Sequence, residues 1–522
     1  MRGDSGATQS PWFASVETPS RPSLDRDTDA DVCIVGAGIA GLSTAYHLAR
    51  EGRSVVVVDD GPIGGGQTGR TTAHLSNAID HLYQEMAKIH GRAGAQLAAA
   101  SHTAAIERIQ RIVMDEHIAC DFERLDGYLF AHDRDTGPEM LERELRAAHD
   151  AGLSDVTLVA HAPLPGFDTG AALRFPRQGQ FHSLKYLNGL VGAIERARGR
   201  LFCGTRATEV EGGEPARVTT TGGRITCDAV VVATNTPTVS RVLVHARQAA
   251  YLTYAIGAVV PAGAITRALY WDTDDPYHYV RLHTLPARAL GAGGDEPVEV
   301  LIVGGEDHKV GQADDAEQRW GRLEAWARLR FPAMERIVYR WSGEVMEPVD
   351  AIGIIGRNPN DADNVFIATG DTGMGMTHGT IAGMLLTDLI QGRENPWTRL
   401  YDPSRLRPRA VTRFVSEAAN MAAQYADWVT PGEVESIDAI PAGEGAVVRR
   451  GLAKVAVFRD EQGRPHERSA VCTHLGCIVD WNHADRTWDC PCHGSRFDCF
   501  GRVVNGPAVS DLERVEDERR VS

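Results

Sequence analysis

The sequence feature that most constrains the fold is a strand, a glycine-rich turn, a helix and a second strand in direct succession. The segment "DVCIV" from Asp31 is typical of a buried strand, and "GAGIAG", "LSTAYHLAREG" and "SVVVVD" follow it. Gly36 permits the tight turn, Gly38 lets a pyrophosphate approach the backbone, and Gly41 lets the helix pack closely on the sheet. This order predicts a βαβ unit at the start of an α/β domain.

The βαβ unit also predicts a dinucleotide site. The helix N-terminus offers N–H groups and a partial positive charge to phosphates. Asp59 ends the second strand, where a carboxylate can hydrogen-bond the adenosine ribose hydroxyls. A second glycine cluster, "GGGQTG" at residues 64–69, fits the glycine spacing but lacks the strand–turn–helix setting. The fingerprint alone does not separate FAD from NAD.

Two further segments favour a flavin. The stretch after Asp59, "DGPIGGGQTGRTTAHLS", is a glycine-rich loop that leads to small hydroxyl residues. Near residue 370, "FIATGDTGMGMTHGTIAG" predicts a strand, a glycine loop and a helix whose N-terminus could stabilise an anionic reduced flavin ring. The candidate cofactor contacts in these two segments are Thr71, Thr72, Gly370, Gly373, Gly375, Met376 and Thr377.

The order of these motifs resembles the D-amino acid oxidase (DAO) family of flavoproteins over roughly residues 31–395. The segment "RWSGEVMEPVDAIGIIG" is similar to the penultimate motif of that family. The resemblance implies FAD as cofactor, bound by an α/β domain of Rossmann type. It also implies a substrate domain with a mixed β-sheet, inserted between the two FAD segments at about residues 205–345.

One position departs from the family pattern. Many members that oxidise α-amino acids carry an arginine in this motif that clamps the carboxylate, whereas Val345 stands there in this sequence. Arg281, in "PYHYVR", is a candidate substitute. On a strand Tyr277, Tyr279 and Arg281 share one face, so we expect them to form a pocket wall or an ordinary cross-strand aromatic pair.

Near the C-terminus, two loops are rich in cysteine and histidine. "CTHLGC" carries Cys472 and His474, and "CPCHGS" carries Cys490 and His493. Four such ligands could hold tetrahedral zinc, but zinc sites of two cysteines and two histidines usually pair like residues within a loop. Here each loop offers one of each, which favours a [2Fe–2S] centre with two thiolates on one iron and two imidazoles on the other.

The two loops resemble the Rieske [2Fe–2S] proteins over about residues 440–515, and "NGPA", with Pro507, is similar to their cluster-covering loop. The resemblance implies a small all-β domain and a disulfide between Cys477 and Cys492. Ser495 resembles the hydroxyl donor to cluster sulfur in respiratory Rieske proteins, but Phe497 replaces their tyrosine. Losing that hydrogen bond predicts a lower reduction potential than the respiratory type.

The chain divides into four expected regions. They are an extended or loosely packed N-terminal arm (1–30), an FAD-binding domain with its insertion (31–405), a connecting amphipathic helix that packs on the main body (406–432), and the Rieske domain (433–522). The formal net charge of −16 argues against nucleic acid and anionic membrane partners. No apolar run approaches the ~20 residues of a membrane span, and the N-terminal residues show no export signal, so we expect a cytoplasmic protein.

The two cofactors together predict an oxidoreductase. A flavin takes a hydride and a [2Fe–2S] cluster moves single electrons, so their fusion favours a dehydrogenase that passes electrons to an external protein or quinone acceptor. We expect oxidation of a C–N bond in a small amine or amino acid. One alternative is a reductase driven by NAD(P)H or a redox partner, and another is a Rieske domain that senses redox state or has a structural role.

Overall fold

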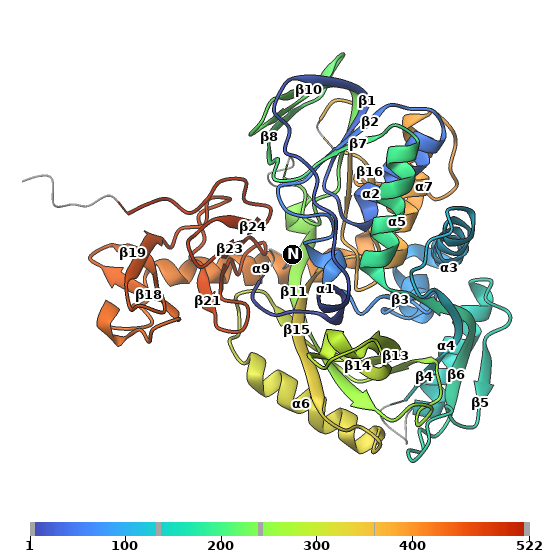
Figure 1. The fold of residues 1–522 in the computed structure, drawn as a ribbon. Helices are drawn as coiled ribbons and strands as arrows, with labels where there is room; N and C mark the ends of the chain where they lie inside the picture. Colours follow the sequence, from blue (N-terminus) through green and yellow to red (C-terminus); the bar gives the residue numbers. More distant parts are fainter. Residues whose placement is uncertain (1–5, 132–136, 239–243, 360, 516–522) are drawn as a thin grey trace, which may run out of the picture.

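The computed structural model describes residues 6–131, 137–238, 244–359 and 361–515. Figure 1 shows two large sheets stacked one above the other, with helices at their sides and a smaller C-terminal domain projecting from the region where they meet. The predicted fold class is confirmed: an α/β domain, a mixed β domain and a small all-β C-terminal domain. Among the described residues no helix is long and apolar enough to cross a membrane.

The first sheet is the α/β sheet predicted from the glycine motif. Its order is β16-β17-β10-β1-β2-β7, parallel except at β16, with β9 and then β8 attached to β10. The inner strands are buried on both faces: α2, which packs against α5 and α7, covers one face, and β9 with the start of β10 and Leu24 covers the other. The elements are β1 (Thr28–Val35), β2 (Val55–Val58), β7 (Arg200–Phe202), β8 (Ala207–Glu211), β9 (Ala216–Thr220), β10 (Arg224–Val232), β16 (Ile354–Arg357), β17 (Val365–Thr369), α2 (Ile39–Arg50), α5 (Ser183–Arg196) and α7 (Gly375–Ile390).

The second sheet has nine strands in the order β15-β11-β14-β13-β12-β4-β6-β3, with β5 attached to β6. Only the β12–β4 pair is parallel. Its strands are β3 (His74–Leu75), β4 (Glu123–Phe130), β5 (Thr157–Val159), β6 (Ala172–Gln180), β11 (Gln248–Val260), β12 (Leu269–Asp272), β13 (Tyr279–Pro286), β14 (Pro297–Lys309) and β15 (Ile337–Pro348). Around it lie α3 (Tyr83–Asp115), α4 (Gly137–Asp150), η3 (Ala287–Leu290) and α6 (Ala316–Arg330).

The limits of the second sheet differ from the expected insertion at 205–345. Strands β8 to β10 lie within that range but belong to the first sheet, whereas β3 to β6 precede it and belong to the second. The chain therefore crosses between the two sheets more than once. Local β character predicts a strand but does not say with which sheet it pairs, because pairing depends on distant partners.

The short helix in the N-terminal arm is packed more closely than we expected. Within α1 (Pro11–Ser15) the side chain of Trp12 is fully buried, and its indole N–H donates to the carbonyl oxygen of Thr71. The hydroxyl of Ser10 donates to the carbonyl oxygen of Gly69. A polar composition suggested loose packing, but the buried Trp12 and these hydrogen bonds hold α1 against α5, β13 and η3.

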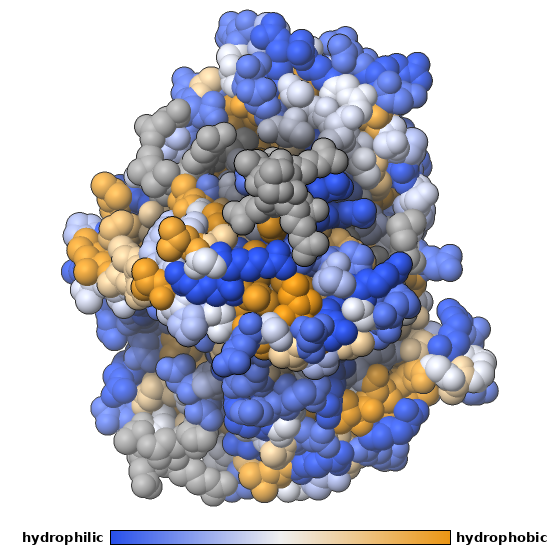
Figure 2. All heavy atoms as spheres, turned by 90° about the vertical axis from the view of Figure 1, so that its left-hand side faces the viewer, coloured by the Kyte–Doolittle hydropathy of each residue, from blue (hydrophilic) through white to orange (hydrophobic). Residues whose placement is uncertain are grey.

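The connecting segment forms the predicted helix but packs through the other face. In α9 (Val411–Gln424) no residue is buried, and Val415 is 58% exposed. The polar side meets the main body instead: Lys309 Nζ lies 2.6 Å from a carboxylate oxygen of Glu417. Figure 2, which looks onto this side, shows hydrophobic residues grouped near the middle of the face. Helical periodicity reports an apolar face but not what that face meets.

Short elements lead into and out of this helix. They are α8 (Thr398–Tyr401), η4 (Pro408–Ala410), η5 (Tyr425–Trp428) and η6 (Ile437–Ala439). The C-terminal domain then has a three-stranded sheet, β18 (Gly445–Arg450), β19 (Ala453–Arg459) and β20 (Pro465–Ser469), and a four-stranded sheet, β21 (Asp480–Asn482), β22 (Thr487–Asp489), β23 (Arg496–Asp498) and β24 (Val503–Asn505).

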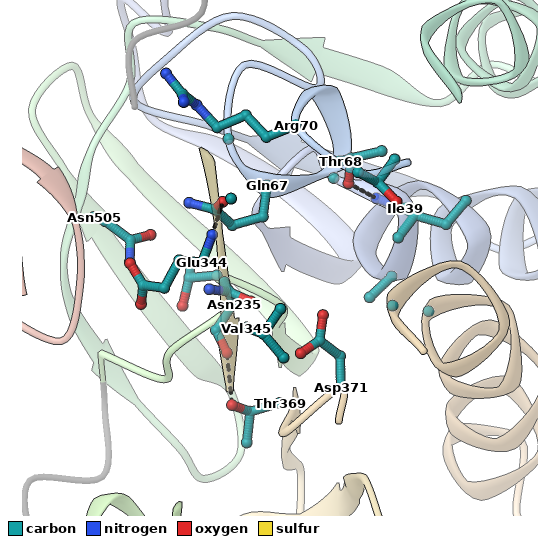
Figure 3. Close-up of a pocket in the computed structure, with 18 of the residues that line it drawn as sticks. Ile39, Gln67, Thr68, Arg70, Asn235, Glu344, Val345, Thr369, Asp371 and Asn505 are labelled. Carbon is teal, nitrogen blue, oxygen red and sulfur yellow. Dashed lines mark hydrogen bonds between the residues drawn. The ribbon is translucent and has the colours of Figure 1, made fainter. Parts of the chain in front are cut away.

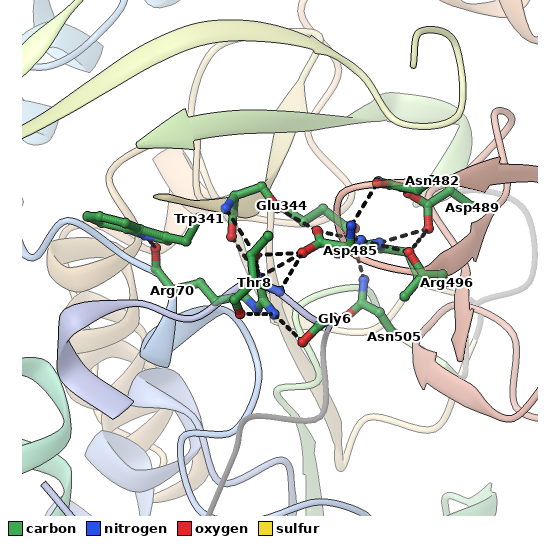
Figure 4. A network of polar contacts seen from close by, with 12 residues as sticks. Gly6, Thr8, Arg70, Trp341, Glu344, Asn482, Asp485, Asp489, Arg496 and Asn505 are labelled. Carbon is green, nitrogen blue, oxygen red and sulfur yellow. Dashed lines mark hydrogen bonds and ion pairs between the residues drawn. The ribbon is translucent and has the colours of Figure 1, made fainter. Parts of the chain in front are cut away.

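A buried ionic network joins the C-terminal domain to the rest of the chain (Figure 4). The carboxylate of Asp485 lies 2.8 Å from Arg496 and 3.4 Å from Arg70, and these three side chains are at most 1% exposed. Arg70 also donates to the backbone oxygens of Gly6, Thr8 and Ser342. Burial raises the pKa of Asp485, but the two arginines outweigh it and hold that pKa well below its ordinary value. This network, called the ionic joint below, ties three parts of the chain together.

Candidate active site and metal centre

One large cavity lies between the two main sheets and collects most of the predicted cofactor residues. It runs from the glycine turn before α2, past the loop before α7, to the second sheet. The predicted residues that line it are Gly36, Gly38, Asp59, Thr71, Thr72, Tyr277, Tyr279, Gly370, Gly373, Gly375 and Met376. Segments far apart in the sequence therefore form a single elongated site.

The nucleotide end of the cavity has the geometry that the glycine motif predicts. Gly36 has a φ of 109°, which favours glycine, and a Cβ there would overlap the carbonyl oxygen of Ala233. Gly38 is the N-cap of α2 and has no side chain, so the backbone end of this helix borders the cavity directly. Asp59 is held at the cavity wall because Ala37 N and Gly61 N donate to its carboxylate at 2.6 and 2.8 Å.

Three predicted site residues do not line the cavity. At Gly41 a Cβ would overlap the carbonyl oxygen of Gly36, so this glycine serves close packing of α2 on the turn. Thr377 is buried and donates to the carbonyl oxygen of Met374. The guanidinium of Arg281 is fully buried and donates to the backbone oxygens of Thr72, Ala73 and Phe181, so it braces the pocket wall from behind. Motif spacing places the backbone, but packing decides where each side chain points.

Two polar groups at the middle of the cavity have unused hydrogen-bonding atoms (Figure 3). Oε1 of Glu344, a side chain 2% exposed, and Nε2 of Gln67 have no partner among the described residues. The other polar atom of each side chain is occupied: Oε2 of Glu344 accepts from Asn505 at 2.7 Å, and Oε1 of Gln67 accepts from the Glu344 backbone N–H at 2.7 Å. Burial raises the pKa of Glu344 well above its ordinary value. Orphaned buried polar atoms fit a large polar ligand such as a flavin.

The end of the cavity next to the second sheet is acidic, which the sequence did not reveal. Asp80, Asp307, Glu347 and Asp371 all line it, together with the predicted Tyr277 and Tyr279. We call these six residues the acidic chamber. The acids come from four separate segments, so no single motif or spacing could have predicted the group. For Glu347 the only signal was its place two residues after Val345 in the penultimate motif.

Three acids of this chamber have a pKa well above the ordinary value. Burial raises the pKa of Asp80, Asp307 and Asp371 to about 7 each, and the charge of Glu347 adds to the rise in all three. The Tyr277 hydroxyl donates to Asp80 at 2.7 Å and partly opposes the shift. Glu347 contacts His81 at 3.1 Å, and both side chains are about a quarter to a third exposed.

The four predicted cluster ligands meet at one end of the C-terminal domain. The thiols of Cys472 and Cys490 are buried and in hydrogen-bonding contact, and this contact chiefly lowers the pKa of Cys472 to about 7. The rings of His474 and His493 lie 4.9 Å apart between centroids. Nδ1 of His493 is buried and has no hydrogen-bond partner among the described residues. Two adjacent thiols and two adjacent imidazoles fit a [2Fe–2S] cluster held by mixed ligands.

The surroundings of this centre complete the predicted pattern. Cys477 and Cys492 form a disulfide that joins the two ligand loops. Ser495 is fully buried, its hydroxyl contacts Cys472, and it accepts from Ala508 N at 3.0 Å. Phe497, where the respiratory proteins have tyrosine, is fully buried beside Trp488 on the neighbouring strand.

The metal centre faces the flavin-type domain. The ring of His474 lies 5.0 Å from that of His245 in η2 (His245–Arg247), which directly precedes β11. A Cβ at Gly494, next to ligand His493, would overlap Ala250 of β11. Strand β24 and the predicted cluster-covering "NGPA" turn that follows line the large cavity through Val503, Val504, Asn505, Gly506, Ala508 and Val509. Because Ala508 N also donates to Ser495 beside the cluster ligands, one segment contacts both sites.

Comparison with known proteins agrees with this geometry. The family model of FAD dependent oxidoreductases (DAO) matches residues 31–389, and that of the Rieske [2Fe-2S] domain matches residues 428–516. The fold and site thus define a flavin-dependent oxidoreductase with an attached iron–sulfur domain. The chain belongs to the DAO family of FAD-dependent oxidoreductases, and it carries a C-terminal Rieske domain. Its cofactors are FAD and a [2Fe–2S] cluster, as predicted.

Relatives extend this similarity to the whole chain. YhfW of Bacillus subtilis (strain 168), whose name describes it as a Rieske 2Fe-2S iron–sulfur protein, is 31% identical to this chain over 98% of both chains. Gamma-glutamylputrescine oxidoreductase of Escherichia coli (strain K12) is 28% identical over 73% of this chain and 89% of its own. Glycine oxidase from Geobacillus kaustophilus shares the fold with a TM-score of 0.58, at 17% identity over 72% of this chain and 99% of that one. The enzyme is of the amine and amino acid oxidase type.

Proposed function

We propose that this enzyme oxidises a C–N bond of a small amine and passes the electrons to an external acceptor by way of the Rieske domain. The observation that carries the proposal is the segment 503–509, which lines the main cavity and, through Ala508 N, donates a 3.0 Å hydrogen bond to Ser495 beside the cluster ligands. The ionic joint supports it because it holds the two sites against each other within one chain.

The residues have separate tasks in this proposal. Gly36, Gly38 and Asp59 bind the nucleotide part of FAD, and the loop before α7 borders its ring. Cys472, His474, Cys490 and His493 hold the cluster. The chemistry that the two groups supply when bound is hydride acceptance from the carbon next to the amine nitrogen and one-electron transfer to an acceptor. The amine loses a hydride and a proton to become an imine, and two equivalents of a one-electron acceptor are reduced.

The cavity favours an amine over an ordinary α-amino acid. Val345 lines it where a carboxylate clamp would stand, and Arg281 is committed to backbone oxygens behind the wall. The relative named for oxidation of gamma-glutamylputrescine supports an amine substrate.

An anaerobic titration tests the proposal. Flavin absorbance is followed while amines, α-amino acids and NAD(P)H are added in turn, and a one-electron dye then serves as acceptor. We expect an amine to bleach the flavin and the dye to be reduced in wild type. In the Cys490→Ser variant the flavin should still be bleached by the amine, but the dye should not be reduced. The control Cys499→Ser, which changes a nearby cysteine outside the ligand set, should behave as wild type.

The alternatives give different results in the same titration. Bleaching by NAD(P)H alone would make the protein a reductase. Undiminished dye reduction by Cys490→Ser, with normal flavin content, would leave the Rieske domain a sensing or structural role.

A further inference from the structure

The acidic chamber has a charge that no neighbouring cation of the cavity wall balances. Its four carboxylates come from four segments: Asp80 from the loop before α3, Asp307 from β14, Glu347 from β15, and Asp371 from the loop before α7. Arg70 and Arg206 are the basic residues among the described lining. Arg70 belongs to the ionic joint, and Arg206 pairs with Asp60 and Asp511.

The histidines that line the cavity do not supply the missing positive charge. Burial lowers the pKa of His74 to about 3 and that of His378 to about 4, so both rings are neutral at physiological pH. His81 lies outside the cavity lining, 3.1 Å from Glu347; burial lowers its pKa, but Glu347 and Asp80 outweigh burial and raise it, so His81 offsets one of the four acids. Arg319 lies behind Asp307, where its side chain pairs with Asp315 and donates to the backbone oxygen of Asp307.

An unused acceptor atom points to a ligand. Oδ1 of Asp307 is buried and has no hydrogen-bond partner among the described residues. Buried carboxylate oxygens without a partner are costly, and a bound ammonium group would satisfy both the hydrogen bond and the charge. Glu347, at the partly exposed end of the chamber, raises the pKa of the other three acids through its charge, so it lies within electrostatic reach of all of them.

The wall between the acids suits an aliphatic chain. Tyr277 and Tyr279 have ring centroids 5.5 Å apart, and His74 packs edge-on against Tyr279 at 5.7 Å. Trp271 lines the same region, and its ring centroid lies 6.3 Å from that of His74. Methylene groups can pack on these rings while charged ends reach the carboxylates.

We infer that the acidic chamber binds an aliphatic diamine or polyamine that carries no carboxylate. This inference rests on the proposed C–N oxidation and names its substrate class. One nitrogen lies at the bond that is oxidised, and a second, protonated nitrogen lies among Asp307, Glu347 and Asp80. A carboxylate in that second position would meet three acids and no cation of the chamber wall.

Three ligands with the same four-carbon spacer test the inference: butane-1,4-diamine, pentan-1-amine and 5-aminopentanoate, which end in an ammonium, a methyl and a carboxylate group. Their affinities are measured by calorimetry with the holoenzyme reduced anaerobically by dithionite, so that binding is read without turnover. We expect the diamine to bind about 30-fold more tightly than pentan-1-amine. Binding of 5-aminopentanoate should be weaker still.

Matched variants locate the effect. Glu347→Gln and Asp307→Asn should each reduce the preference for diamine over pentan-1-amine at least about tenfold. Glu317→Gln, which changes an exposed carboxylate on α6, should leave the preference unchanged. Flavin content reports whether each variant is folded. The comparison of the three ligands on the wild-type protein tests the inference even where a variant does not fold.

Failure of the inference and failure of the proposed function give different results. If pentan-1-amine or 5-aminopentanoate binds as tightly as the diamine and bleaches the oxidised flavin, the inference is overturned and amine oxidation stands. If no amine binds or bleaches the flavin, both are overturned.

Discussion

The ionic joint and the acidic chamber both contain carboxylates withdrawn from water, but they treat those charges in opposite ways. In the joint, Asp485 faces two arginines that hold its pKa well below the ordinary range. In the chamber, Asp307 faces other acids, and burial raises its pKa to about 7. A carboxylate whose partners belong to the fold serves structure. One whose partner must come from outside serves binding, because its charge is balanced only when a ligand arrives.

The largest expected effect comes from the joint. Asp485→Asn leaves Arg70 and Arg496 with less negative charge around them, so we expect a loss of about 3 kcal/mol in the free energy of unfolding. Because the folded pKa of Asp485 is depressed, its stabilisation is present above the unfolded pKa of about 3.9 and is lost as the pH falls below it. Urea unfolding of the holoenzyme at several pH values measures both. A loss below about 1 kcal/mol would contradict a structural role.

The same kind of substitution in the chamber should have the opposite effect on the free energy of unfolding. Asp307→Asn removes an unbalanced charge, so we expect the ligand-free protein to gain about 2 kcal/mol at pH 8, discounted for the partly exposed side chain. The folded protein retains a proton there that the unfolded chain releases. The contribution of Asp307 to wild-type stability therefore falls as the pH rises toward 7, and the gain of the variant grows over that range. Unfolding at pH 5 and pH 8 tests this, and a destabilised variant would remove the contrast with the joint.

Diamine affinity should rise with pH. Asp80, Asp307 and Asp371 lose protons around pH 7, whereas an aliphatic diamine stays charged, so we expect about tenfold tighter binding at pH 8 than at pH 6. The titratable and charged groups that face these acids are His81, Tyr251, Tyr277, Tyr279, His278, Arg319, Glu344 and Glu347. Calorimetry over this range measures the trend, with pentan-1-amine as the control. Affinity that falls with rising pH would contradict the charge assignment.

The smallest expected effect concerns the cluster. Phe497→Tyr adds a hydroxyl at the position where respiratory Rieske proteins have one, and we expect the reduction potential to rise by tens of millivolts, on the order of 50 mV. A redox titration followed by electron paramagnetic resonance measures it. Trp488→Phe, which changes the neighbouring buried ring without adding a hydroxyl, is the control. An unchanged reduction potential in Phe497→Tyr would contradict the hypothesis that the missing hydroxyl at this position lowers the potential of the cluster.

Much of the cofactor architecture could be predicted because its determinants are contiguous. Gly36, Gly38 and Asp59 lie in one βαβ unit, and Cys472, His474, Cys490 and His493 lie in two short loops, so residue type and spacing carry the geometry. Arg281 and Thr377 were misplaced for a different reason. Backbone position follows from the motif, but the direction of a side chain depends on what packs around it.

The sequence by itself determined the two cofactors, the fold class and the absence of the usual arginine at Val345. Only the tertiary structure brought Asp80, Asp307, Glu347 and Asp371 together, and only it placed the Rieske domain against the cavity through Asp485 and its arginines. The physical reason is that local backbone motifs are set by neighbouring residues. The energy of a charge depends on burial and on partners that are distant in sequence.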